Sequence, residues 1–172
     1  MIDFATAFAE LRADDGSATP YCWIVLGLLL DFGGVLDGPD TAPLTDLVAE
    51  LRARGVRTAV LSNDPGGPGA ASLRNLGGGR VVDEVVLSGD VGLAKPDPRV
   101  YRYSAHLLGV EPGECVFVDD LRVNVRGAVA VGMVGVHHVG VTATVGELRI
   151  LFDAEDVGSA GTTRNARRGH GE

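Results

Sequence analysis

A continuous apolar run near the N-terminus constrains the fold of this chain more than any other feature. Residues 24–30 read Ile-Val-Leu-Gly-Leu-Leu-Leu, Asp31 closes the run, and Gly33-Gly34 follow shortly after it. A strand with one solvated face alternates apolar and polar residues, whereas a continuous apolar run predicts a strand that is buried on both faces. Strands of this kind belong to parallel sheets covered by helices, so the run favours an α/β fold.

The remainder of the chain alternates strand and helix patterns. Further strands are predicted at 58–61, 81–87, 116–118 and 134–136, and helical patterns begin at Pro43, in the stretch 65–72, at Pro98 and after Asp120. We expect a last helix that starts at a capping box formed by Thr144 and Glu147 and ends near Phe152. Interleaved strands and helices imply right-handed crossovers, and therefore a Rossmann-like three-layer sandwich around a central parallel sheet.

The chain divides into one domain with two short flanking segments. Residues 1–20 are predicted to be an N-terminal arm with a short amphipathic helix at 3–13. Residues 21–152 hold all the predicted strands, and a chain of 172 residues is long enough for one domain with a sizeable core. Residues 153–172 are polar and rich in glycine, which predicts a disordered tail.

Charge and cysteine content exclude several classes of protein. A formal net charge of −8 argues against a surface for nucleic acid or anionic membrane. The apolar run is too short to span a bilayer and no basic segment precedes it, so we expect a cytoplasmic protein. Cys22 and Cys115 have no metal-binding spacing, and Cys115 opens an apolar strand, where we expect an inert buried thiol. His137 and His138 follow a strand without a third ligand in view, which favours structural roles.

Polar residues follow the predicted strands at their carboxyl ends. Asp31 ends the first strand, Ser62 ends the second, and the pair Asp119-Asp120 ends a later one, while Lys95 lies in a loop just before a capped helix. In a parallel sheet these ends meet at one edge, where ligands bind. Carboxylates, a hydroxyl and a cation together suit a phosphate group with a hard divalent metal such as Mg²⁺.

The residues around these positions resemble a known family. "LLLDFGGVL", "AVLSN", "GLAKPDP" and "VFVDDLRVNVRGAVAVGM" are similar to the four ordered motifs of the haloacid dehalogenase-like hydrolase superfamily, over roughly residues 24–137. Response-regulator receiver domains use a similar set of residues, but there the acidic pair comes first and the lysine last. Here Lys95 precedes Asp119-Asp120, so the order favours the hydrolases.

The resemblance implies a nucleophile and a metal site. Asp31 would attack phosphorus and form an aspartyl-phosphate. Asp31, the carbonyl group of Gly33, and the carboxylates of Asp119 and Asp120 would hold Mg²⁺. For the acidic pair, capping of the following helix is the alternative role.

The resemblance also implies a set of phosphate ligands. Ser62 and the amide of Asn63 would bind phosphate oxygens, and Lys95 would neutralise charge on the nucleophile and the substrate. Asn124 would orient the last loop. The alternatives are a hydroxyl that only satisfies the end of a strand and a lysine that is solvated in its loop.

One residue inside the opening stretch departs from the family pattern. Phosphatases of this family usually carry a second aspartate two residues after the nucleophile, to protonate the leaving group, and Gly33 stands there instead. Loss of a general acid–base costs about 10²–10⁴-fold in rate. Asp37 is a candidate substitute, although "DGPD" is also ordinary turn chemistry. We therefore expect hydrolysis to favour leaving groups that need no proton, such as acyl or aryl phosphates.

A second departure is the lack of room for a cap domain after the first motif or between the second and third. An open site suits a large substrate, a lid from a second copy of the chain or from residues 3–13, or no catalysis at all.

Two functions follow: a Mg²⁺-dependent phosphohydrolase acting on a phosphorylated small molecule or macromolecule, and a catalytically weakened domain that binds a phosphorylated ligand or a protein partner. Dehalogenation would need no metal, so the acidic pair counts against it.

Overall fold

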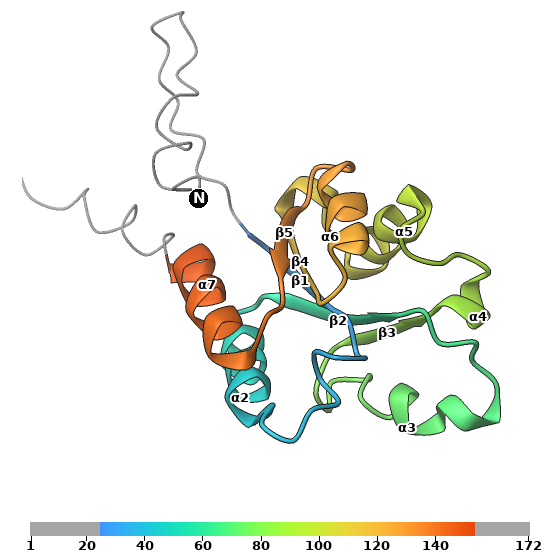
Figure 1. The fold of residues 1–172 in the computed structure, drawn as a ribbon, viewed down its shortest axis with the longest axis horizontal. Coiled ribbons are helices and arrows are strands. Elements are labelled where there is room, and N and C mark those ends of the chain that lie inside the picture. Colours follow the sequence, from blue (N-terminus) through green and yellow to red (C-terminus); the bar gives the residue numbers. More distant parts are fainter. Residues whose placement is uncertain (1–24, 154–172) are drawn as a thin grey trace, which may run out of the picture.

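A five-stranded parallel sheet forms the centre of the molecule (Figure 1). The computed structural model describes residues 25–153. The strand order is β3-β2-β1-β4-β5, and each neighbouring pair is parallel. The sheet therefore has the parallel, helix-connected form that the sequence predicts. The strands are β1 (Gly27–Leu30), β2 (Arg57–Ser62), β3 (Glu84–Leu87), β4 (Cys115–Asp119) and β5 (Val134–His137).

Helices cover both faces of this sheet and complete a three-layer sandwich (Figure 1). Helices α2 (Ala42–Ala53) and α7 (Val141–Asp153) lie together on one face. Helices α5 (Pro98–Leu108) and α6 (Arg122–Val129) cover the other. The connections also contain the short helices η1 (Pro68–Ala70), α3 (Ala71–Arg74), α4 (Ser88–Val91) and η2 (Pro112–Glu114).

The apolar run at the start of the chain explains why β1 is central. Every residue of β1 is buried. Leu28 and Leu30 belong to the core cluster under α2 and α7, whereas Leu29 points to the opposite cluster under α5 and α6. Because successive strand residues face opposite sides, only a continuous apolar run can fill both cores.

Two helices begin as the sequence predicts. α2 carries a proline in its first turn, a position where the missing N–H of proline costs nothing. α5 begins after Asp97, whose carboxylate accepts a hydrogen bond from the Arg99 N–H at 2.9 Å, and it ends at Gly109, which adopts a left-handed φ of 74°. These local signals fix the start of the helix that follows the Lys95 loop.

The prediction of a capping box at Thr144 is wrong. α7 begins at Val141, so Thr144 lies inside the helix and is buried. Its hydroxyl lies 2.9 Å from His138 Nδ1, which gives it a side-chain partner in place of a backbone N–H group. The His138 N–H donates to the Asp119 carbonyl at 2.9 Å, so these contacts tie α7 to the end of β4.

Other boundaries differ by a few residues. β1 begins at Gly27 rather than at residue 24, and β3 begins at Glu84 because the N–H groups of Val81 and Val82 donate to the Leu76 carbonyl in a turn. The short helix α4 has no counterpart among the predicted elements. The predicted arm at 1–20, its helix and Cys22, and nearly all of the predicted tail lie outside the described residues.

Within residues 25–153 no further domain interrupts the sandwich. A turn joins β1 to α2, and the connection from β2 to β3 holds only η1 and α3. The same part of the chain has no helix of the length and apolar character needed to cross a membrane. Cys115 is buried in β4, as predicted, and burial raises the pKa of its thiol to about 12.

Candidate active site

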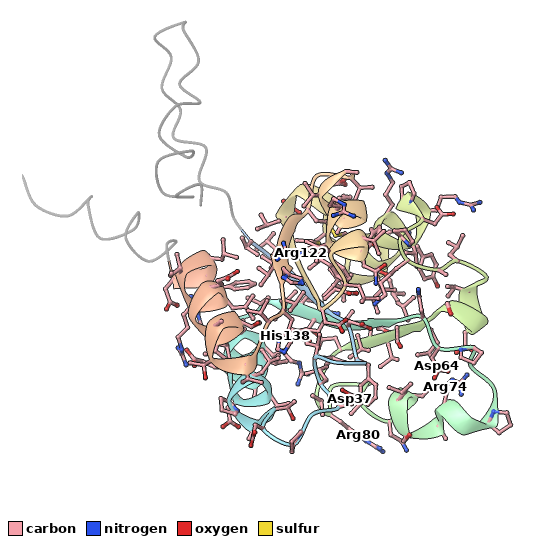
Figure 2. The ribbon with its side chains drawn as sticks, in the orientation of Figure 1. Asp37, Asp64, Arg74, Arg80, Arg122 and His138 are labelled. Atoms are coloured by element: carbon pink, nitrogen blue, oxygen red, sulfur yellow. The ribbon has the colours of Figure 1, made fainter. Side chains whose placement is uncertain are left out.

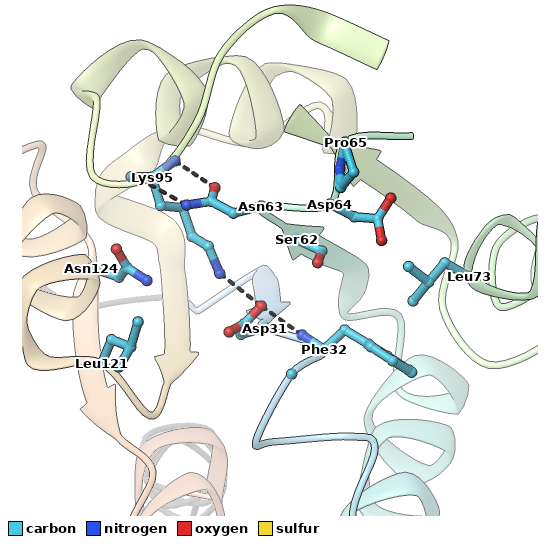
Figure 3. A pocket seen from close by; sticks show the side chains of 11 residues that line it. Asp31, Phe32, Ser62, Asn63, Asp64, Pro65, Leu73, Lys95, Leu121 and Asn124 are labelled. Carbon is cyan, nitrogen blue, oxygen red and sulfur yellow. Dashed lines mark hydrogen bonds and ion pairs between the residues drawn. The ribbon is translucent and has the colours of Figure 1, made fainter. Parts of the chain in front are cut away.

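The carboxyl ends of β1, β2 and β4 meet at a pocket of about 370 Å³ (Figure 3). The register places Leu30 beside both Val60 and Val118, and the Asp31 N–H donates to the Val118 carbonyl at 2.9 Å. The strands therefore deliver their terminal polar residues to one edge. The predicted site residues that line this pocket are Asp31, Gly33, Ser62, Asn63 and Lys95, together with Asn124.

The Lys95 ammonium group links the ends of two strands. Its Nζ lies 2.7 Å from Asp31 Oδ1 and 2.7 Å from Asp119 Oδ2. The side chain of Lys95 is 1% exposed, that of Asp119 is fully buried, and that of Asp31 is 11% exposed. Nζ also lies 5.5 Å from the centre of the Phe117 ring. Lys95 is thus a buried, paired cation and not a solvated loop residue.

The environment of Asp31 raises the pKa of its carboxyl group. Burial is the main cause, and it outweighs the lowering effect of Lys95, while the charge of Asp119 adds to the increase. The Phe32 N–H donates to Asp31 Oδ1 at 2.7 Å, the same oxygen that contacts Lys95. Oδ2 has no such partner among the described residues, so it is the oxygen available to a ligand in the pocket.

Asn63 fixes the backbone of the lysine loop. Its Nδ2 donates to the Lys95 carbonyl at 2.9 Å, and its Oδ1 accepts from the Lys95 N–H at 2.8 Å. The carboxamide is therefore engaged with Lys95. Phosphate binding by Asn63 stays a prediction, in which the backbone N–H group would be the donor.

Asn124 and the Leu121 N–H hold the carboxylate of Asp119 from the other side. Asn124 Nδ2 lies 3.1 Å from each Asp119 oxygen, and the Leu121 N–H donates to Oδ1 at 2.8 Å. The Tyr101 hydroxyl donates to the Asn124 carbonyl at 2.8 Å. The N-cap residue of α6 is Leu121, without a side-chain cap, so neither aspartate is the N-cap residue.

Asp120 presses against the turn that follows β1. A Cβ atom on Gly34 would lie 2.6 Å from Asp120 Oδ2, and Gly34 has a φ of 73°, so only glycine fits there. His137 Nε2 lies 2.9 Å from the Asp120 carbonyl oxygen. His137 and His138 thus contact backbone and side-chain groups around the acidic pair.

The three carboxylates form a candidate metal centre. Asp31, Asp119 and Asp120 each offer an oxygen, and these atoms lie within 4.8 Å of one another. Lys95 balances only one of the three negative charges, and Asp31 and Asp119 are buried. Hard oxygen ligands with excess negative charge fit a hard divalent cation such as Mg²⁺.

Sequence reasoning missed part of the pocket wall. Phe32, Asp64, Pro65, Leu73 and Leu121 also line it. Asp64 follows Ser62 by two residues at the end of β2, so its position just beyond a strand end could have indicated that it lines the pocket. Leu73 comes from α3, and nothing in its local pattern indicates the site.

Asp37 is not among the residues that line the pocket. Its Oδ1 accepts a hydrogen bond from the Gly34 N–H at 2.8 Å, and the side chain is exposed in the turn after β1 (Figure 2). These contacts match the turn-forming interpretation.

The strand ends thus place a buried lysine between two aspartates, three carboxylates within 4.8 Å of one another and a serine at one edge of a parallel sheet. Residues 24–132 match the family model of the haloacid dehalogenase-like hydrolases. The chain belongs to that family.

Similar proteins include phosphatases. The chain is 39% identical over 106 residues to a phosphatase of Mycobacterium tuberculosis, covering 60% of this chain and 48% of that protein. It is 35% identical over 121 residues to a phosphoserine phosphatase of Thermus thermophilus, covering 63% and 48%. The chain thus spans about half the length of these relatives. A crystal structure of an uncharacterized protein from Corynebacterium glutamicum is 43% identical, with a TM-score of 0.73 over 75% of this chain and 96% of that one.

Proposed function

We propose that this protein is a Mg²⁺-dependent phosphomonoester hydrolase that works through an aspartyl-phosphate on Asp31. The observation that carries the proposal is the position of Lys95, which is fixed between Asp31 and Asp119 on the floor of a pocket that Ser62 also lines. The similarity to phosphatases supports the same class of reaction.

In the first step, Asp31 Oδ2 attacks phosphorus, and the bond from phosphorus to the leaving oxygen breaks with its electron pair on that oxygen. Lys95 holds Oδ1, which aims Oδ2 at the pocket and offsets the charge of the carboxylate. The Ser62 hydroxyl donates to a phosphate oxygen. In the second step, the oxygen of a water molecule attacks the phosphorus of the aspartyl-phosphate and gives up a proton to the phosphate group. The bond between phosphorus and Asp31 Oδ2 breaks with its electron pair on Asp31, and inorganic phosphate leaves.

Asp31, Asp119, Asp120 and the carbonyl group of Gly33 would hold the metal. When bound, Mg²⁺ would reduce the repulsion between the anionic nucleophile and the anionic phosphate. Asn124 and the Leu121 N–H keep the Asp119 carboxylate in place for this role.

Gly33 supplies no acid for the leaving group. A Cβ atom at this position would meet nothing within 4 Å, so a side chain there would face open space at the edge of the pocket. We therefore propose that acyl and aryl phosphates, whose leaving groups need no proton, react fastest.

The test is hydrolysis of an aryl phosphate and an acyl phosphate by the wild type and Asp31→Asn, with and without Mg²⁺. Metal-dependent turnover that Asp31→Asn abolishes and Asp37→Asn retains would support the proposal, because Asp37 serves only the turn. If the wild type binds Mg²⁺ but hydrolyses neither compound, the second function is favoured: a domain that binds a phosphorylated ligand or a protein partner.

The remaining assignments are also proposals. We propose a phosphorylated small molecule or macromolecule as the ligand, no nucleic-acid or membrane partner, a cytoplasmic location, and a second copy of the chain as the cover of the open site. Sedimentation across a range of concentrations, combined with the hydrolysis assay, tests whether activity depends on a dimer.

A further inference from the structure

One carboxylate in the pocket wall has no place in the proposed reaction. Asp64 follows Ser62 by two residues and lines the pocket. Figure 3 shows Asp64 and Leu73 along one side of the pocket, across from Asn124 and Leu121, with Asp31 between the two sides. Asp64 therefore lies beside the space that the organic part of a phosphomonoester would enter.

The negative charge of Asp64 is not neutralised by an ion pair within the pocket. Of the residues that line the pocket, only Asp31, Asp64 and Lys95 carry titratable side chains, and Lys95 is paired with Asp31 and Asp119. Asp64 Oδ1 accepts the Gly66 N–H at 2.7 Å, and Asp64 forms no ion pair with any residue in the range 25–153.

The nearest candidate cation is committed elsewhere. Arg74 lies on α3 near Asp64 (Figure 2), and the charge of Asp64 contributes, after the larger effect of Asp90, to the raised pKa of its guanidinium group. Its hydrogen bonds go elsewhere: Nη2 donates to Asp90 at 2.7 and 2.9 Å, and Nη1 donates to the Gly67 carbonyl at 2.7 Å. The bidentate pair with Asp90 fixes the geometry of the guanidinium group. Because one guanidinium group faces the carboxylates of both Asp90 and Asp64, this part of the wall keeps a net negative charge.

The backbone of Asp64 is held against α4. Its carbonyl accepts hydrogen bonds from the Ser88 hydroxyl at 2.8 Å and from the Gly89 N–H at 3.0 Å. A Cβ atom on Gly89 would overlap the carbonyl group of Pro65, so the two segments are in direct backbone contact. The backbone of Asp64 is therefore a fixed part of the wall, and the Gly66 N–H holds one of its carboxylate oxygens.

We propose that Asp64 sets the specificity for the leaving group. Among phosphomonoesters of alcohols, it favours those that carry a hydroxyl or ammonium group near the ester oxygen, because those groups donate a hydrogen bond to its second carboxylate oxygen. It disfavours leaving groups that carry a carboxylate or a second phosphate, because like charges are brought together. This inference rests on the proposed hydrolysis at the same site.

Three monophosphates of matched size separate charge from shape: ethanolamine phosphate, ethylene glycol monophosphate and phosphoglycolate. The assay is kcat/KM for each with the Mg²⁺-loaded wild type, Asp64→Asn and Asp64→Glu. We expect phosphoglycolate to be the poorest substrate of the wild type. Asp64→Asn, which keeps an oxygen for the Gly66 N–H, should improve phosphoglycolate relative to the glycol ester by roughly tenfold or more. Asp64→Glu should keep the wild-type order.

Binding gives a second readout that does not depend on turnover. Calorimetric titration of Mg²⁺-loaded Asp31→Asn and of Asp31→Asn/Asp64→Asn with the same compounds should give the same order and the same change. Asp37→Asn, which also removes one nearby charge, should leave the order unaltered.

An identical ranking by the wild type and Asp64→Asn, in turnover and in binding, would overturn the inference while hydrolysis of an aryl phosphate still supported the proposed function. Conversely, absence of all hydrolysis would count against the proposed function, and the binding order would still decide the role of Asp64.

Discussion

Replacement of Lys95 by methionine tests the electrostatics of the site directly. The change keeps most of the volume of the side chain but removes the charge that touches both Asp31 and Asp119. The two contacting oxygens each lie 2.7 Å from Nζ, so they are close to each other. At a separation of about 5 Å and an effective dielectric constant of about 20, their repulsion is about 3 kcal/mol. Loss of one partner of a buried ion pair costs about 3–5 kcal/mol, so both estimates agree.

The destabilisation should depend on pH. Burial already raises the pKa of Asp31, and removal of Lys95 removes the group that lowers it. A carboxyl group with a raised folded-state pKa favours folding when protonated, and this contribution is lost as the pH rises through that pKa. The deficit of Lys95→Met relative to the wild type should therefore be largest at neutral pH and should shrink as the medium becomes acidic.

The destabilisation should also respond to metal. With the ammonium group absent, the excess negative charge increases, so Mg²⁺ should stabilise Lys95→Met more than it stabilises the wild type. The assay is urea unfolding at two pH values, with and without Mg²⁺, alongside phosphatase activity, which should be lost. Arg52→Met, which breaks the partly buried pair with Asp83 away from the site, is the control and should show no such response to Mg²⁺. Equal stability of Lys95→Met and the wild type at neutral pH without metal would refute the reasoning.

Four further substitutions test separate parts of the structure. Gly33→Asp enters open space, and if it restores an acid it should raise turnover of alkyl phosphates by about 10²–10⁴-fold with little change for aryl phosphates; a uniform change would contradict this role. Gly127→Ala places a Cβ atom 2.9 Å from the Pro96 carbonyl oxygen beside the lysine loop, so urea unfolding should show a loss of about 1–3 kcal/mol together with a fall in kcat. Gly146→Ala in α7 meets nothing within 4 Å and should gain up to about 1 kcal/mol, and the reverse order of the two alanine variants would count against the packing argument. Burial raises the pKa of Asp83, but hydrogen bonds from β2 and an arginine outweigh it and leave the pKa lowered, so Asp83→Asn should lose stability at neutral pH by about 1–3 kcal/mol and approach the wild type below about pH 4; a deficit constant with pH would be the contrary result.

The sequence predicted the parts of the fold that depend on local pattern. The apolar run predicted a strand buried on both faces, and Asp97 with its following proline predicted the start of α5. The prediction failed at Thr144, which lies inside α7 and does not cap it. Its hydroxyl contacts His138, and this partner is visible only once β5 and α7 pack together. The starts of β1 and β3 were misplaced for a similar reason, because hydrogen bonding to the neighbouring strands decides where a strand begins.

For the site, the sequence determined the identity and order of Asp31, Ser62, Lys95 and Asp119-Asp120, because parallel topology alone brings such strand ends to one edge. Only the tertiary structure decided how they are used. It showed that the carboxamide of Asn63 holds the lysine loop and that Asp64 lines the pocket without an ion-pair partner among the described residues. The physical reason is that hydrogen bonds and charge pairs form between segments far apart in the chain, and their geometry depends on side-chain packing that no local periodicity records.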